Sequence, residues 1–269
     1  VADEKAAAIE ADAEAYGWDI AAKLADASSA WDELVAKSAQ IDAFVSDETS
    51  YGELMGRYGQ DTGNAKQNEA LHNQGVTLIG VSQFNALAEL AGRPAVDVGE
   101  DGYAVNNTLD AMKALSEALA RKGETVVAGG RVLESSGELR SQPMEDTTFS
   151  ASGAELIVPD AVIAGLRAQG AVPEQSILNL MYRTDRAEGD KLLEQVLAEA
   201  SPANPEVAAS GWKFSPKPWP VTLSFTAEEV LVQSGGMNLM ISYLALYIGF
   251  VFLIATAAVL AIQQLSEAS

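Results

Sequence analysis

The chain has 269 residues, no cysteine and a formal net charge of -21. Such a negative charge repels nucleic-acid phosphates, so DNA and RNA are not expected partners, whereas cationic partners such as basic peptides would be attracted. The lack of cysteine excludes a disulfide scaffold, a zinc–thiolate site and a thiol nucleophile. The acidity can equally serve only to keep a surface domain soluble, so its meaning stays open.

The N-terminal residues, VADEKAAAIEADAEA, contain neither an initiator methionine nor the apolar core of a signal peptide. We therefore expect a processed product or, in better agreement with the C-terminal end, a piece of a longer protein. Ala2 to Ala15 has a helical pattern with little apolar face, which is typical of a solvent-exposed stalk. Gly17 is expected to end this helix, and Trp18 to Ile20 is expected to begin a short strand.

The next segment also has a helical pattern. Residues 30–45 read AWDELVAKSAQIDAFV, and the positions of Leu34, Val35 and Ile41 favour a helix. Residues 59–74 are polar and glycine-containing, which predicts a loop.

From residue 75 onward, short apolar runs alternate with helical patterns, and no repeat of fixed period is present. This alternation predicts a compact α+β domain. The segment from Pro202 to Pro220 carries five prolines and is expected to be irregular. Strands are expected at residues 76–81, 103–106, 125–128, 131–133, 155–158, 177–182 and 221–225.

Capping residues place the helices between these strands. Ser82 is expected to cap a helix that Gly92 closes, and Asn107 or Thr108 is expected to cap the helix from Leu109 to Arg121. Two further helices are expected at residues 160–169 and 185–200.

The most apolar stretch of the chain is Leu239 to Ile262, LMISYLALYIGFVFLIATAAVLAI. These 24 residues contain no charge, proline, asparagine or glutamine, and from Asn238 to the end only Glu267 is charged. A helix of this length reaches ~36 Å and crosses a hydrocarbon core of about 30 Å. Tyr243 and Tyr247 lie near one end, where aromatic side chains favour the headgroup layer. We predict a transmembrane helix.

Small side chains share one face of this predicted helix. Ser242, Ala245, Gly249 and Thr256 are spaced by three, four and seven residues, and small residues let membrane helices approach closely. The pattern favours a helix in a bundle, although small residues are also common in single membrane anchors. Because no basic residue follows the helix, the positive-inside rule does not set its orientation.

The search for catalytic chemistry finds no candidate. His72, the only histidine, lies in a polar segment and is interpreted as an ordinary loop residue; no GxSxG motif accompanies it. Asp97, Glu100 and Asp101 resemble part of a calcium loop, but Thr108 stands where the loop needs glutamate.

Other motifs carry no more weight. There is no Walker A motif, and Gly129-Gly130-Arg131 lacks the context of a dinucleotide site. We therefore expect no enzyme, catalytic residue, metal or cofactor. Trp212, Phe214 and Trp219 are expected either to form an exposed contact surface or, preferably, to pack under the domain.

Three stretches together resemble FtsX-like permease subunits of bacterial ABC transporters, most closely the bacitracin and lantibiotic resistance group. Residues 243–269, with Gln264-Leu265-Ser266-Glu267-Ala268, resemble the membrane helix that follows the large external domain and runs into a cytoplasmic coupling region. Residues 80–107 resemble that domain's succession of a strand, a helix with the pattern (Y/F)-N-x-L, an acidic turn and an extended Y-x-(L/V)-N strand. LIVPD at 156–160 resembles its late strand-to-helix step. The likeness covers most of residues 75–269.

The resemblance implies a bacterial plasma-membrane permease with residues 1–237 outside the cell. Its partners would be a cytoplasmic ATPase subunit, other membrane helices of the permease, and an extracellular ligand such as a cationic peptide or a lipid-linked molecule. The expected domains are a helical stalk and opening subdomain (1–74), an α+β extracellular domain (75–237), and a transmembrane helix with the start of a cytoplasmic extension (238–269). The alternatives are a non-transporting protein that signals to cell-wall hydrolases or a sensor kinase, and a single-pass surface binding module.

Overall fold

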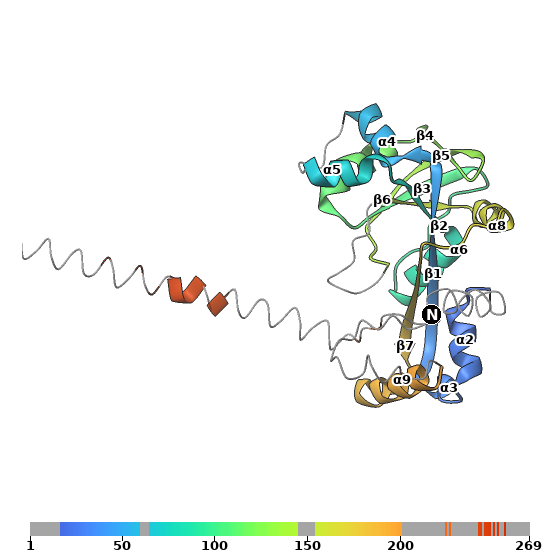
Figure 1. Cartoon of the computed structure of the whole chain (residues 1–269), viewed down its shortest axis with the longest axis vertical. Helices are drawn as coiled ribbons and strands as arrows, with labels where there is room; N and C mark the ends of the chain where they lie inside the picture. The colour runs from blue at the N-terminus through green and yellow to red at the C-terminus, as the bar shows by residue number, and fades with distance from the viewer. Residues whose placement is uncertain are drawn as a thin grey trace, which may run out of the picture. The chain divides into compact units, whose positions relative to one another are not determined.

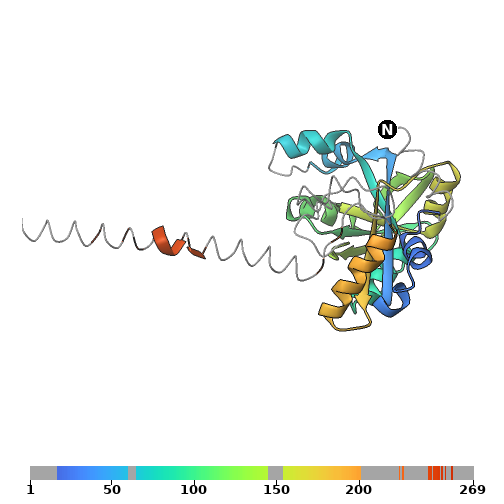
Figure 2. The same cartoon turned by 60° about the horizontal axis from the view of Figure 1, so that its bottom comes forward.

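The computed structural model of the chain describes residues 17–59, 65–144 and 154–200, together with single positions and short runs between Ser224 and Thr256. The chain divides into two compact units, and we describe each by itself. The first comprises Val1–Glu145 and Phe149–Ser224, and the second Asp146–Thr148 and Phe225–Ser269. The first unit is an α+β fold on a mixed seven-stranded sheet (Figures 1 and 2), which confirms the predicted α+β class.

The strands of the sheet lie in the order β4-β5-β3-β6-β2-β1-β7. The pairs β2–β6 and β3–β5 are parallel, and the other neighbours are antiparallel. The strands are β1 (Val35–Ser50), β2 (Gly75–Gly80), β3 (Gly102–Asn107), β4 (Thr125–Ala128), β5 (Arg131–Arg140), β6 (Ala154–Val158) and β7 (Gln175–Tyr182).

Helices cover both faces of the sheet, and most of them directly precede or follow a strand in the chain. A short 3-10 helix, η1 (Asp110–Met112), leads into one of them. The α-helices are α2 (Ile20–Ala27), α3 (Trp31–Leu34), α4 (Tyr51–Tyr58), α5 (Ala65–His72), α6 (Val81–Leu90), α7 (Lys113–Leu119), α8 (Asp160–Ala168) and α9 (Arg186–Ala200).

Strand β1 is 16 residues long and joins two parts of this unit. It pairs with β2 from Ala43 to Ser50 and with β7 from Val35 to Ala43. We call β7, α2, α3, α9 and residues 35–42 of β1 the small lobe. The large lobe contains β2–β6, α4–α8 and the rest of β1. Figure 1 shows β1 running from one lobe into the other.

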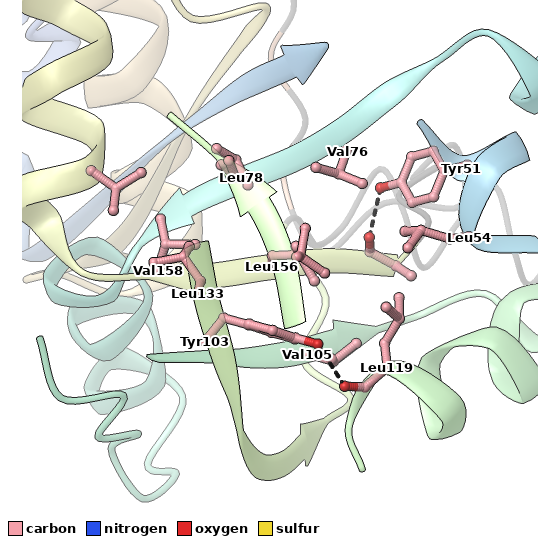
Figure 3. Packing of buried hydrophobic residues seen from close by; sticks show 14 of the residues in the cluster. Tyr51, Leu54, Val76, Leu78, Tyr103, Val105, Leu119, Leu133, Leu156 and Val158 are labelled. Atoms are coloured by element: carbon pink, nitrogen blue, oxygen red, sulfur yellow. Dashed lines mark hydrogen bonds between the residues drawn. The ribbon is translucent and has the colours of Figure 1, made fainter. Parts of the chain in front are cut away.

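The large lobe has an apolar core on each face of the sheet. On one face, side chains from α4, α7 and α8 pack on alternate residues of the strands. Two buried tyrosines anchor this core: Tyr51 donates to the carbonyl of Ala154 at 2.6 Å, and Tyr103 donates to that of Leu119 at 2.9 Å (Figure 3). On the other face, α6 packs on Ala104, Ile157 and neighbouring residues.

The small lobe has a core of its own. The apolar faces of α2, α3 and α9 meet each other and the side chains of Leu178, Leu180 and Tyr182 on β7. Leu178 and Leu180 pair with Gln40 and Ser38 of β1, so the three helices cover one defined face of this two-stranded part of the sheet.

The predicted helix over residues 30–45 is wrong. Only Trp31–Leu34 is helical, and β1 begins at Val35. The interior of β1 is buried on both faces: Ile41 and Ala43 lie on one face and Asp42 and Phe44 on the other. A strand buried in this way does not alternate between apolar and polar residues, and its pairing with two other strands outweighs local helix propensity.

Two neighbouring expectations are also wrong. Residues Trp18 to Ile20 do not begin a strand: Gly17 and Trp18 form a turn with positive φ angles, and Asp19 caps α2 by accepting from Ala22 N at 2.8 Å. Within residues 59–74, Ala65–His72 form helix α5 instead of a loop.

The predicted helix caps are replaced by other contacts. Helix α6 begins at Val81 after Gly80, so Ser82 lies within its first turn and is not the cap. The Asp160 carboxylate supplies the capping oxygen instead, accepting from Ser82 N at 3.1 Å. The Asn107 side chain accepts from Leu109 N at 3.2 Å, and the helix after it starts as η1 and covers only Lys113–Leu119.

The remaining expectations in the described residues are confirmed to within a few residues, although β5 extends to Arg140 and not only to Leu133. The predicted elements at 2–15, 202–220 and 221–225 lie outside the described residues, apart from Ser224. The predicted domain boundaries stay predictions. Strand β1, which belongs to the predicted opening subdomain (1–74), lies in the same sheet as the later strands.

Candidate functional site

The predicted membrane-helix packing face lies in the second unit. Ser242, Ala245 and Thr256 are helical and exposed, whereas Gly249 lies outside the described residues. Thr256 Oγ1 donates to the carbonyl of Phe252 at 2.8 Å, which satisfies the hydroxyl within its own helix. The part of the chain that the structure describes contains no helix long and apolar enough to cross a membrane.

Large apolar side chains occupy the other described helical positions of this unit. Their exposed fractions lie between 46% and 71%. Apolar side chains packed on a soluble core would be largely shielded from water, and these are not. These residues are Tyr243, Leu246, Tyr247, Ile248, Phe250 and Phe252.

In the first unit, the buried carboxylate of Asp42 in β1 is 2% exposed and has hydrogen-bond or ion-pair partners on four side chains. Its Oδ1 accepts from Gln40 Nε2 at 2.8 Å and from Ser176 Oγ at 2.7 Å. Its Oδ2 accepts from Gln83 Nε2 at 2.9 Å and forms an ion pair with Arg167. We call these five residues the Asp42 cluster. It joins β1, β7, α6 and α8.

Gln40 extends the Asp42 cluster to the start of the described chain. Its Oε1 accepts from Ile20 N at 2.9 Å, and its Nε2 donates to Trp18 O at 2.8 Å. The side chain therefore holds the turn at Trp18 against the sheet, and Trp18 is the non-glycine residue with a positive φ, 63°, in the described part of the chain.

A second buried carboxyl group, Glu155 of β6, lies opposite Asn106 of β3 and is 1% exposed. Its Oε2 accepts from Asn106 Nδ2 at 2.9 Å, but Oε1 has no hydrogen-bond partner within the described residues. Burial raises the pKa of Glu155 to about 8, against the smaller lowering effect of the Asn106 hydrogen bond. At neutral pH the group is therefore mostly protonated.

Asn106 also holds the segment that leaves β5. Its Nδ2 donates to Gln142 O at 2.9 Å and its Oδ1 accepts from Gln142 N at 2.8 Å. One asparagine side chain thus joins the connection after β5 to the buried acid of β6.

The other residues singled out in the sequence make local contacts within the fold. His72 ends α5, and a side chain at Gly52 would collide with it. Asp97 caps its own turn by accepting from Gly99 N at 2.9 Å, and Asp101 pairs with Arg131. Within the described residues, no three His, Asp or Glu side chains are grouped as a metal site would require. Trp212, Phe214 and Trp219 lie outside those residues.

Sequence reasoning missed both buried carboxyl groups. The signal was present in the segments QIDAFV and AELIVPD, where one acid stands between apolar residues inside a strand. Such an acid is buried with its strand and needs partners from elsewhere in the fold, which local patterns do not identify.

No family model matches the chain, and no curated protein is significantly similar to it.

Proposed function

We propose that this chain is the extracytoplasmic domain and the following membrane helix of a permease subunit of a bacterial ABC transporter. The subunit couples ATP hydrolysis on a separate cytoplasmic subunit to the export, removal or sensing of an extracellular peptide or lipid-linked molecule. The observation that carries the proposal is the uncharged run from Leu239 to Ile262, placed directly after an acidic α+β domain.

The exposed apolar side chains of the second unit support a membrane environment. Tyr243, Phe250 and Phe252 are 63% to 71% exposed, and water is an unfavourable surrounding for so much apolar surface on one helix. Lipid or neighbouring helices would cover these side chains. The resemblance to FtsX-like permeases supplies the transporter part of the proposal, and the charge of -21 agrees with a cationic ligand.

In this proposal, the face formed by Ser242, Ala245, Gly249 and Thr256 packs against another helix of the permease. Close approach at Gly249 depends on its lack of a side chain. Gly249→Leu should therefore abolish assembly with the rest of the permease, whereas a single-pass anchor would tolerate the change.

Membrane topology is the first test, and residues 1–269 contribute no cysteine of their own to the labelling. Ala114→Cys in α7 and Ser266→Cys near the C-terminal end are introduced separately into the full gene, and intact cells are treated with a membrane-impermeant maleimide. We expect labelling at residue 114 only, and labelling at residue 266 only after the cells are permeabilised. Equal labelling of both positions in intact cells would rule the proposed topology out.

The coupling itself is tested with the full permease reconstituted together with its proposed ATPase subunit. We expect cationic antimicrobial peptides to stimulate ATP hydrolysis and neutral peptides of the same length to leave it unchanged. A correct topology without a response to any peptide would favour either the signalling alternative or the extraction of a lipid-linked molecule.

A further inference from the structure

The two lobes of the first unit are joined differently on the two faces of the sheet. On one face the contact is apolar: α6 packs on Ala39 and Ile41 of β1 and on Ile177 of β7, in one core with residues of the large lobe. This packing is continuous across the junction between the lobes. Apolar packing has no directional requirement, so it tolerates small changes of angle.

On the other face the apolar packing is interrupted. The core under α8 reaches Phe44 of β1, and the core under α9 reaches Leu178 of β7, but the two form separate clusters. The Asp42 cluster lies between them, since Asp42 is two residues before Phe44 and pairs with Ser176, two residues before Leu178. The Asp42 cluster therefore separates the core under α8 from the core under α9. An apolar residue at position 42 would join the two.

The donors to Asp42 come from both lobes. Gln40 and Ser176 belong to the two strands of the small lobe, whereas Gln83 and Arg167 come from α6 and α8 of the large lobe. The carboxylate is 3% exposed as a side chain, but that of Arg167 is 40% exposed, with its guanidinium 5.3 Å from the centre of the Phe44 ring. Of the ion pair, the arginine is thus the partner that water reaches.

We propose that the Asp42 cluster is a latch that fixes the small lobe against the large lobe, and that the apolar contact of α6 on the opposite face is the hinge. Hydrogen bonds and an ion pair depend on direction and distance, so the closed arrangement is held at one angle. Opening exchanges the Arg167 and Gln83 contacts for water and leaves the cores under α8 and α9 intact, because neither of these two cores contains the Asp42 cluster.

Spin-label distance measurements on the full chain in detergent test this latch. The labels are attached at Ala114→Cys in α7 of the large lobe and Ala198→Cys in α9 of the small lobe, both exposed positions in a chain without other cysteines. The parent chain should give one narrow distance distribution. Arg167→Gln, which removes the charge and keeps an amide donor, should add a second, shifted population, and Asp42→Asn should enlarge it.

Lys191→Gln is the matched control, because it removes a cation whose pair with Glu188 lies within α9 at 3.2 Å. It should leave the distribution unchanged. Thermal melts of each variant show whether both lobes stay folded. The proposal is overturned if folded Arg167→Gln gives the same distance distribution as the parent chain. It is also overturned if Lys191→Gln shifts the distribution as much as Arg167→Gln does. Arg167 is half-exposed, so this variant keeps the test decisive even where Asp42→Asn lowers stability. The outcome is independent of any transport activity.

Discussion

Asp42 and Glu155 are both almost completely buried in the same sheet, yet the structure treats them in opposite ways. Asp42 accepts from four side chains, one of them a guanidinium, whereas Glu155 accepts from a single asparagine. A buried carboxyl group is stabilised either by partners that compensate its charge or by a proton that removes the charge. Asp42 is stabilised by partners that compensate its charge, and Glu155 is stabilised by a proton.

The largest effect is expected where the partners are most numerous. Asp42→Ala removes the acceptor of Gln83 and Ser176 and one of the two acceptors of Gln40 Nε2, and it separates Arg167 from its counter-ion. The side chains that lose this acceptor are partly buried and Arg167 is 40% exposed, so the free energy of unfolding should fall by about 1–3 kcal/mol for each donor left without a partner. Urea denaturation of the full chain measures it. Asp101→Ala removes an exposed pair with Arg131 and should cost less than about 1 kcal/mol; equal losses would contradict the comparison.

Glu155→Gln should change how stability depends on pH. The folded-state pKa is about 8, above that of an unfolded glutamate, so the contribution of Glu155 is full below about pH 4.5 and is lost as pH rises to about 8. The glutamine of the variant does not titrate, so its free energy of unfolding does not include this decrease with pH. Its stability relative to the parent should rise by about 1.4 kcal/mol per pH unit at the steepest point. Denaturation at pH 5, 6.5 and 8 measures it, with the exposed Glu117→Gln as a control that shows no such slope.

Asn106→Ala should be milder than Asp42→Ala, because it removes fewer partners. The substitution leaves Glu155 without its donor and frees the backbone of Gln142. The expected loss is about 1–3 kcal/mol in the free energy of unfolding, with the pKa of Glu155 moved further upward. Repeating the substitution in the Glu155→Gln background separates the two contacts. Additive losses would show that Asn106 does not act through Glu155.

The smallest effect is expected for a charge pair at the surface. Lys37 of β1 and Glu89 of α6 are 2.9 Å apart with side chains 55% and 74% exposed, and Lys37 lowers the pKa of Glu89. Glu89→Gln should leave the denaturation midpoint unchanged at physiological salt, because water and ions screen the pair. A loss close to that of Asp42→Ala would mean that burial is not what distinguishes the two sites.

Local sequence signals predicted most of the large lobe. Gly129-Gly130 between β4 and β5, Pro159 before α8 and the apolar run of β2 each act within a few residues, so the sequence alone locates them. Strand β1 was missed because its partners lie far along the chain: Ala43 pairs with both Ile79 and Gln175. The acids Asp42 and Glu155 were missed for the same reason, since their donors come from other elements.

The long reach of β1 has a consequence for the order of folding. The buried residues of the large-lobe cores have all been synthesised by Leu166, but the small lobe needs β7 and α9, which end at Tyr182 and Ala200. Pairing of Val35 with Tyr182 closes a loop that contains nearly the whole large lobe. Contacts between residues so far apart in the chain form slowly. We therefore expect the small lobe, with α2 and α3, to fold after the large lobe.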